Sequence, residues 1–450
     1  MPDDIACLFL NPSSRTVKKM TRPTLRKMKW ERPRPGRLVQ NAIALVISSA
    51  GSSTIGIVFW AVAAHLATQA AVGRTTAEIA AMMLLTNMAQ LSFGSIFERF
   101  LPIAGHLTGE FVRRAYATCL SFALILATVY VITGFGHSFL PSAFIWRALF
   151  IVSVVLWTIF ALQDSVMIGL RASKWVAVEN IAYSIAKLAL LPACVFLSAV
   201  HGIFVAWVAP LIFTNLAVTW YLFSRRIPEQ MLTPAVADLP STRELIVLAG
   251  AQYASLLTSV FIPSIVTLIV ISRLGAVANA HYFLPAMIYA SLSLFTWAII
   301  RSFLVEASSE PHALRAHANS ALRALALLLV PSVVLGCIFA PEFLGVFGHS
   351  YEANGTTLMR MLLLSFPGVS VMIFYSTFAW LDRRVWSMTV RNLATNALYL
   401  IVVILLIDRH GIDAIGIAAL VNSAFTVILF LPPSIKRYRQ TAFTSTELGI

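Results

Sequence analysis

The sequence predicts an all-α polytopic membrane protein of about twelve transmembrane helices, arranged as two parallel six-helix repeats around a central cleft. Of its 450 residues, 59% are hydrophobic and 12% are charged, and the mean hydropathy is +0.82. In soluble domains, about half of the residues are hydrophobic and about a quarter are charged. Twelve long apolar stretches and an internal repeat complete the prediction. A chain so poor in charge cannot cover a soluble surface. A soluble enzyme or nucleic-acid-binding domain is therefore excluded, despite a net charge of +14.

Each predicted helix is a stretch of about 20 apolar residues, the length that crosses a bilayer. Leu, Ile, Val, Phe and Ala dominate every stretch. The first six are 40–65, 79–101, 115–136, 146–169, 176–198 and 202–223. The second six are 246–272, 279–303, 320–340, 356–380, 387–407 and 412–433. Prolines interrupt several of them, which transporter helices tolerate because neighbouring helices satisfy the freed backbone groups: Pro192, Pro210, Pro263, Pro285, Pro331 and Pro367.

The basic residues fix the orientation of these helices. Of the 33 Lys and Arg residues, 27 lie in the two tails and the even-numbered connections. Five lie at the opposite end, which we call the basic-poor end: Arg74, Arg147, Arg273, Arg360 and Arg409. Cytoplasmic loops carry the excess of Lys and Arg. We therefore expect a multi-pass protein of the inner (plasma) membrane with both termini in the cytoplasm.

The charge and proline patterns also divide the chain into parts. We expect a basic cytoplasmic tail at 1–37, a six-helix lobe at 38–224, a cytoplasmic linker at 225–243, a second lobe at 244–437 and a short tail at 438–450. The first tail has no apolar run of signal-peptide length. It fixes topology or binds anionic lipid, unless translation begins at Met20 or Met28.

An internal repeat relates the two lobes. The segment 135–139, Phe-Gly-His-Ser-Phe, recurs as Phe-Gly-His-Ser-Tyr at 347–351, an offset of 212 residues. Asn180 and Asn392 share this offset. Six helices bring the chain back to the side from which it entered, so both lobes have the same orientation and form a parallel repeat. Two such lobes around a cleft suit a transporter, with substrate between them.

Motifs for nucleotide, metal or cofactor binding are absent from the sequence. It has no G-x-x-x-x-G-K-[ST] loop for ATP, no H-E-x-x-H pair and four scattered cysteines. We expect no metal, no cofactor and no enzymatic activity. Transport would then be downhill, coupled to an ion or driven by a partner.

Two six-helix halves without an ATPase resemble the multidrug/oligosaccharidyl-lipid/polysaccharide exporter superfamily. The local features are Glu-Arg-Phe-Leu-Pro at 98–102, Gly-Leu-Arg at 169–171 and the outer segment 341–348 with Tyr351 after it. These resemble most the polysaccharide-biosynthesis (O-antigen or exopolysaccharide) flippases, over about 38–437. The resemblance implies transfer of an undecaprenyl-diphosphate-linked oligosaccharide from the inner to the outer leaflet, for lipopolysaccharide or exopolysaccharide synthesis.

Lys187 is the sharpest candidate site residue, because it lies near the middle of the predicted helix 176–198. At about 1.5 Å per residue it is about 16 Å from the cytoplasmic end, too deep for the ammonium to reach either interface easily. Charges inside a span usually face a cavity or a partner. Lys187 therefore either binds the diphosphate or an acidic sugar, or pairs with a neighbouring group for structure.

Four further residues lie near the cytoplasmic ends of the helices. We expect Arg99 and Arg301, at equivalent helix ends, to bind substrate with Lys187, as a cationic vestibule. Glu98 and Asp164 are candidates for gating or ion coupling. For Asp164 and Glu179 the simpler interpretation is pairing with Arg171 or Lys174 close by.

The predicted function is therefore flipping of a polyprenyl-diphosphate-linked oligosaccharide by alternating access. Membrane lipids, and glycan polymerase or export proteins, are the expected partners, with no nucleic acid. One alternative is a multidrug/cation antiporter of the same superfamily, which would need an acidic residue in mid-membrane. The other is an oligosaccharide polymerase or ligase, which the short outer loops disfavour because such enzymes carry a large external loop.

Overall fold

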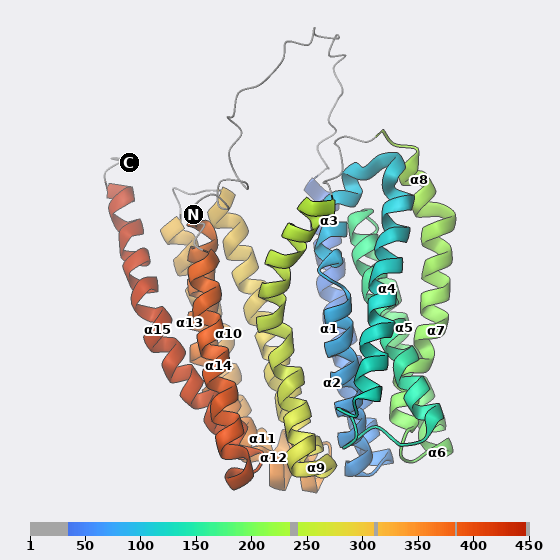
Figure 1. Ribbon diagram of the computed structural model, residues 1–450. Helices are drawn as coiled ribbons and strands as arrows, with labels where there is room; N and C mark the ends of the chain where they lie inside the picture. The colour runs from blue at the N-terminus through green and yellow to red at the C-terminus, as the bar shows by residue number, and fades with distance from the viewer. Residues whose placement is uncertain (1–34, 235–241, 310–313, 383–384, 447–450) are drawn as a thin grey trace. The chain divides into compact units, whose positions relative to one another are not determined.

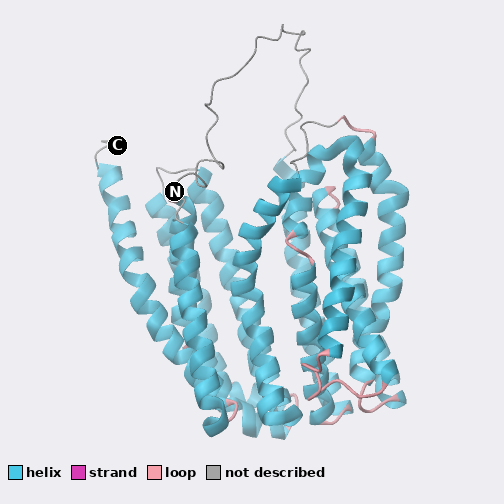
Figure 2. Cartoon of the chain, in the orientation of Figure 1, coloured by secondary structure: helices cyan, strands magenta, loops and turns pink. Residues whose placement is uncertain are grey.

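The computed structural model describes residues 35–234, 242–309, 314–382 and 385–446. In these residues the chain is helical and joined by short turns, without a strand (Figure 2). Residues 1–43 and 44–450 form separate compact units, and of the first only the start of a helix is described. The candidate site and its contacts lie within 44–450. Nearly all of the expected N-terminal tail falls outside the described residues, as do residues 235–241 of the expected interlobe linker.

The helices of the first half are labelled in Figure 1. They are α1 (Pro35–Leu66), α2 (Gln69–Ala89), α3 (Phe93–Ala104), α4 (Thr108–Ile132), α5 (Phe144–Gly169), α6 (Ser173–Leu197) and α7 (Gly202–Tyr221). A 3-10 turn (Gly105–Leu107), a π-helical turn (Leu222–Arg226) and α8 (Ile227–Met231) complete this half.

The second predicted span, 79–101, is not one continuous helix. It begins ten residues earlier, at Gln69, where the Thr68 side chain accepts a hydrogen bond from the Ala71 amide at 3.3 Å and caps α2. Leu91 and Ser92 have φ of 47° and 62°, which stops the helical hydrogen-bond pattern before α3 begins. Left-handed backbone is uncommon for non-glycine residues, so the apolar composition gave no sign of this break.

The second half is built from α9 (Thr242–Ser309), α10 (Leu314–Ile338), α11 (Ala340–Gly345), α12 (His349–Leu364), α13 (Phe366–Leu381), α14 (Val385–His410) and α15 (Asp413–Thr446). The predicted spans 246–272 and 279–303 both lie in α9, on either side of Gly275. Gly275 has φ 85° and ψ −179°, a conformation that a residue with a Cβ rarely adopts.

Five hydrophobic clusters fill the described interior. The largest joins the halves near the basic-poor end: it includes Phe59, Val72 and Met82 from the first half, and Leu284 and Tyr351 from the second. The other four clusters each draw on one half alone. Nine helical segments in the described residues are long and apolar enough to cross a membrane. The predicted fold class, an all-α membrane protein of two six-helix halves, is confirmed.

Candidate functional site

Lys187 lies in α6 and is only 5% exposed. Its Nζ is 3.7 Å from the centroid of the Trp207 ring, 5.0 Å from that of Tyr183 and 5.4 Å from that of Phe59. These rings come from α7, α6 and α1. We call Phe59, Tyr183 and Trp207 the aromatic cage. A cation over ring faces is stabilised by about 2 kcal/mol or more when desolvated, so the cage compensates for part of the hydration that the ammonium has lost.

Contacts among the three residues of the cage fix their relative positions. The Tyr183 hydroxyl donates a hydrogen bond to the Trp207 carbonyl at 2.9 Å. The Phe59 and Trp207 rings pack edge to face with centroids 5.4 Å apart. No carboxylate within the described residues forms an ion pair with Lys187, and its N–H groups make no hydrogen bond there. The structural alternative, pairing of Lys187 with a polar side chain, is therefore not observed.

Lys187 is one end of a buried polar row on α6. Glu179, Tyr183 and Lys187 are spaced four residues apart, which places them on one face of the helix. Ser184 is buried beside them. About two turns, or roughly 12 Å, separate Glu179 from Lys187 along the helix axis. A single helix thus carries an acid and a base at different depths in the interior of the first half.

The acidic end of this row meets Asp164 of α5. Asn180 Nδ2 donates to both Asp164 carboxylate oxygens, at 3.4 and 3.3 Å. Glu179 is 5% exposed, and neither of its carboxylate oxygens has a hydrogen-bond partner. The two carboxylates are close enough for their charges to interact. The buried hydroxyl of Tyr116, on α4, lies near both carboxylates and also has no hydrogen-bond partner in the described part of the chain. We call Tyr116, Asp164, Glu179 and Asn180 the acidic cluster.

The expected local pairing of these acids is wrong. Asp164 and Glu179 form no ion pair with Arg171 or Lys174, and both basic side chains are exposed. Arg171 has φ 57° in the turn between α5 and α6. A buried carboxylate without a cation is costly. The acidic cluster is consequently a place where a proton or a small cation lowers the free energy.

The other predicted site residues are not brought to Lys187 by any observed contact. Glu98 and Arg99 are exposed on α3. The Arg99 guanidinium lies 5.3 Å from the centroid of the adjacent Phe100 ring. The side chain of Arg301 lies outside the described residues, although its backbone belongs to α9. A cationic vestibule formed by Arg99 and Arg301 therefore stays a prediction.

Where α2 crosses α9, the two halves touch through backbone. A Cβ on Gly73 would lie 1.7 Å from the Ala276 carbonyl oxygen, so only glycine fits this crossing. Asn279, fully buried, donates from Nδ2 to the Gly73 carbonyl at 2.7 Å and to the Thr76 hydroxyl at 2.9 Å. We call Gly73, Thr76, Ala276 and Asn279 the seam. It lies at the basic-poor end, beside Arg74 and Arg273.

An aromatic contact connects the cage to the same interface. The Trp60 ring packs against Phe283 of α9 with centroids 4.6 Å apart, and against Trp207 at 5.9 Å. Sequence reasoning missed Trp60 and Trp207 as site residues. Trp207 is 20 positions after Lys187 on the next helix, and no spacing rule relates residues on different helices. It lies only five residues into the stretch 202–223, where an interfacial aromatic residue is expected, so nothing in the sequence distinguished it.

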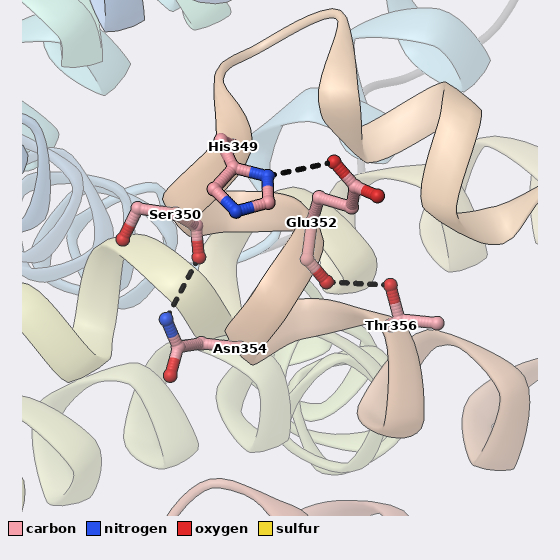
Figure 3. A network of polar contacts seen from close by, with 5 residues as sticks. All are labelled: His349, Ser350, Glu352, Asn354 and Thr356. Carbon is pink, nitrogen blue, oxygen red and sulfur yellow. Dashed lines mark hydrogen bonds and ion pairs between the residues drawn. The ribbon is translucent and has the colours of Figure 1, made fainter.

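The repeated histidines lie in turns at the basic-poor end. His137 Nδ1 is 2.9 Å from the Gly134 carbonyl oxygen, and His349 Nδ1 is 3.2 Å from Glu352 Oε2. Figure 3 shows the second arrangement at the start of α12, where the Asn354 side chain also donates to the Ser350 carbonyl at 2.8 Å. These contacts fit a role in the local capping of turns and of the start of α12.

Comparison with known proteins places the fold. No protein-family model matches the sequence, and no curated protein matches it. Among solved structures, an inward-facing multidrug-resistance MATE family transporter of the MOP superfamily superposes with a TM-score of 0.67 at 14% identity, covering 90% of this chain and 99% of that one. The chain has the fold of these transporters.

Two further structures of this fold differ in conformation or function. An outward-facing multidrug-resistance MATE family transporter gives a TM-score of 0.57 at 14% identity, with 90% of this chain and 96% of that one covered. A MOP superfamily transporter from Pyrococcus furiosus gives 0.56 at 14% identity and the same coverage. Its reversed binding-pocket polarity was taken to suggest a different function. At such identities the likeness concerns the fold alone.

Proposed function

We propose that the protein is a membrane transporter that moves a polyprenyl-diphosphate-linked oligosaccharide across the inner membrane by alternating access. The observation that carries the substrate class is the buried ammonium of Lys187, which has rings around it and no carboxylate paired with it in the described residues. An ammonium with unused N–H donors attracts an anion. A diphosphate, or an acidic sugar attached to it, supplies that charge.

The alternating-access part of the proposal rests on the position of the seam. Of the five clusters in the described core, one includes both halves, and it holds them together near the basic-poor end. At the basic-rich end, the clusters around Phe97 and around Phe374 belong to separate halves. The higher TM-score with the inward-facing relative, 0.67 against 0.57, supports the same state. In the proposed cycle, the halves rock until the seam opens.

Coupling to an ion is the proposed role of the acidic cluster. Glu179 is buried and the neighbouring Asp164 is half-buried, and neither carboxylate has a basic partner in the described residues. Uptake of a proton or a monovalent cation removes the cost of their charge. Glu98 stays proposed as a gate at the cytoplasmic entrance, and Arg99 and Arg301 stay proposed as a cationic vestibule that binds substrate.

A second candidate, a multidrug/cation antiporter, is favoured by the same acidic cluster and by the multidrug relatives. The two candidate functions differ in the charge that the substrate-facing groups present. In the Pyrococcus furiosus relative, a difference in pocket polarity was taken as a sign of a different function. Lys187 gives this chain a cationic group, which favours an anionic substrate over a drug cation.

Reconstitution distinguishes the candidates. The purified protein is placed in vesicles with a fluorescent short-chain prenyl-diphosphate oligosaccharide in one leaflet, and transfer is followed by quenching. We expect transfer by the native chain and by Lys187→Arg, and at least a tenfold slower rate for Lys187→Ala at equal protein incorporation. Efflux of a cationic dye without oligosaccharide transfer would instead identify the antiporter. In cells, deletion should cause lipid-linked oligosaccharide to accumulate in the inner leaflet.

A further inference from the structure

A groove with a volume of about 530 Å³ lies in the second half, between α10, α13 and α15. Its wall is almost entirely hydrocarbon, and typical residues are Leu325, Leu329, Val333, Phe366, Phe374 and Tyr438. Ligand sites usually have volumes of about 300–1,000 Å³. The groove therefore has the size of a binding site, and its lining selects an apolar ligand.

The few polar groups in the wall are already satisfied. Ser370 donates to the Phe366 carbonyl at 3.1 Å, and Ser434 donates to the Phe430 carbonyl at 2.7 Å. The Tyr438 hydroxyl donates to Asn319 Oδ1 at 2.6 Å. A polar ligand would lose hydration in this groove and gain no hydrogen bond from these hydroxyls. A hydrocarbon chain loses nothing there.

The groove opens toward the lipid and extends to the basic-rich end. Val330, one of its lining residues, is 61% exposed on α10. The lining follows α10 from Leu322 to Val334, and on α15 it ends at Tyr438, near the end of the helix that we expect in the cytoplasm. A lipid chain can thus enter sideways from the bilayer, with its head group at the cytoplasmic surface.

Three basic side chains lie near the Tyr438 end of the groove. Arg315 lies with its guanidinium 5.9 Å from the centroid of the Tyr438 ring. Lys436 and Arg439 are exposed on the same turn of α15. No ion pair of these three is found in the described part of the chain, whereas Arg437 is occupied by Asp382 at 2.8 Å. Three free cations beside an apolar groove complement a phosphate attached to a hydrocarbon chain.

We propose that this groove holds the isoprenoid chain of the lipid-linked substrate, with its diphosphate at Arg315, Lys436 and Arg439 before transfer. This inference rests on the proposed function, because a flipped head group must stay attached to a chain that remains in the apolar phase. A single groove fits the one chain of a polyprenyl carrier. A diacyl phospholipid would place its second chain outside the groove.

Photo-crosslinking tests the proposal on the full chain in phosphatidylcholine nanodiscs. The probe is a polyprenyl diphosphate with a diazirine in its chain, and labelled peptides are identified by mass spectrometry. We expect labels on α10, α13 and α15, and competition by unlabelled polyprenyl phosphate at least tenfold more effective than by phosphatidylglycerol. Equal competition by the two lipids would overturn the proposal in favour of an ordinary annular lipid.

Matched variants locate the chain. Val330→Trp fills the groove from its exposed side, whereas Leu327→Trp adds the same ring on the same helix at a position that is 78% exposed and outside the lining. We expect labelling to fall at least fivefold in the first variant and to stay unchanged in the second. Both positions are exposed, so neither substitution should disturb the packing of the core. Equal labelling of the two would refute the groove as the binding site.

The head-group end is tested with Arg315→Ala, and the control is Arg409→Ala at the opposite end of the helices. We expect a three- to tenfold weaker apparent affinity for the diphosphate probe in Arg315→Ala, and no change for a probe that lacks phosphate. Vesicle transfer is measured on the same preparations. Transfer without groove labelling would overturn this inference and leave the function standing. Groove labelling without transfer would overturn the proposed function and leave the lipid site standing.

Discussion

Gly73→Ala is a direct test of alternating access, because it adds one methyl group at the crossing of α2 and α9. The new Cβ would lie 1.7 Å from the Ala276 carbonyl oxygen, 2.7 Å from its carbonyl carbon and 3.0 Å from the Ala280 nitrogen. All three are backbone atoms of α9, so no side-chain rotation relieves the overlap. The two helices have to separate.

The expected size of the effect follows from this overlap and from the hydrogen bond that it weakens. Overpacking of a well-packed interior costs about 1–3 kcal/mol. Separation also stretches the hydrogen bond from Asn279 to the Gly73 carbonyl, now 2.7 Å, which in a membrane is worth about 0.6 kcal/mol on average. The sum is about 2–4 kcal/mol. Because the strain exists only while α2 touches α9, the ratio of seam-closed to seam-open molecules should fall by about thirtyfold to several hundredfold.

Spin labels at Arg74 and Val277, both exposed and next to the seam, report this ratio as a distance distribution. The native cysteines are first replaced. We expect a longer mean distance in Gly73→Ala and slower transfer in vesicles. Gly56→Ala is the matched control, since a Cβ on Gly56 meets nothing within 4 Å. A Gly73→Ala distribution that coincides with both the native and the Gly56→Ala distributions would refute a seam that must open and close.

Three other predictions concern the interior. Lys187→Ala should abolish oligosaccharide transfer at normal expression. Trp207→Phe keeps a ring face under the ammonium, so its transfer rate should fall by less than tenfold. Full transfer activity of Lys187→Ala in the vesicle assay would exclude this residue from the site. Glu179→Gln keeps the shape of this buried side chain, which has no observed hydrogen bond, but removes its charge. Transfer by this variant should no longer respond to an imposed proton or sodium gradient. A response equal to that of the native protein would exclude the acidic cluster from coupling. Gly368→Ala should destabilise the second half by about 1–3 kcal/mol, because its Cβ would lie 2.6 Å from Ser423 Cα, and thermal unfolding followed by size-exclusion chromatography should show a lower midpoint than for Gly56→Ala.

The all-helical class and the bounds of several helices could be predicted because hydrophobic length is a local property. The predicted stretches 146–169 and 176–198 agree with α5 and α6 to within three residues at each end. The break at Leu91 and Ser92 could not be predicted, because it depends on backbone torsions that apolar composition does not encode.

For the candidate site, sequence identified the charged residue but not its surroundings. Lys187 is conspicuous because it is a charged residue in the middle of an otherwise apolar helix. Its partners Phe59 and Trp207 are ordinary aromatic residues on other helices, so only the tertiary structure brings them together. Asp164 illustrates the opposite error. Proximity in sequence suggested Arg171, but the described structure gives Asp164 the amide of Asn180, about two turns into α6.

The aromatic cage and the seam differ in how they respond to rocking. All three rings of the cage belong to the first half, so movement of that half as a unit leaves the contacts of Lys187 intact. The hydrogen bonds of Asn279 and the contact of Trp60 with Phe283 cross between the halves and must break. In the proposed cycle, the contacts that break are therefore those of the seam, while the surroundings of the proposed substrate-binding ammonium stay constant. In the proposed cycle, the side of the membrane to which the Lys187 ammonium is accessible changes, while its contacts with the cage do not. Such constancy suits a group that is proposed to receive a diphosphate from one leaflet and to release it toward the other.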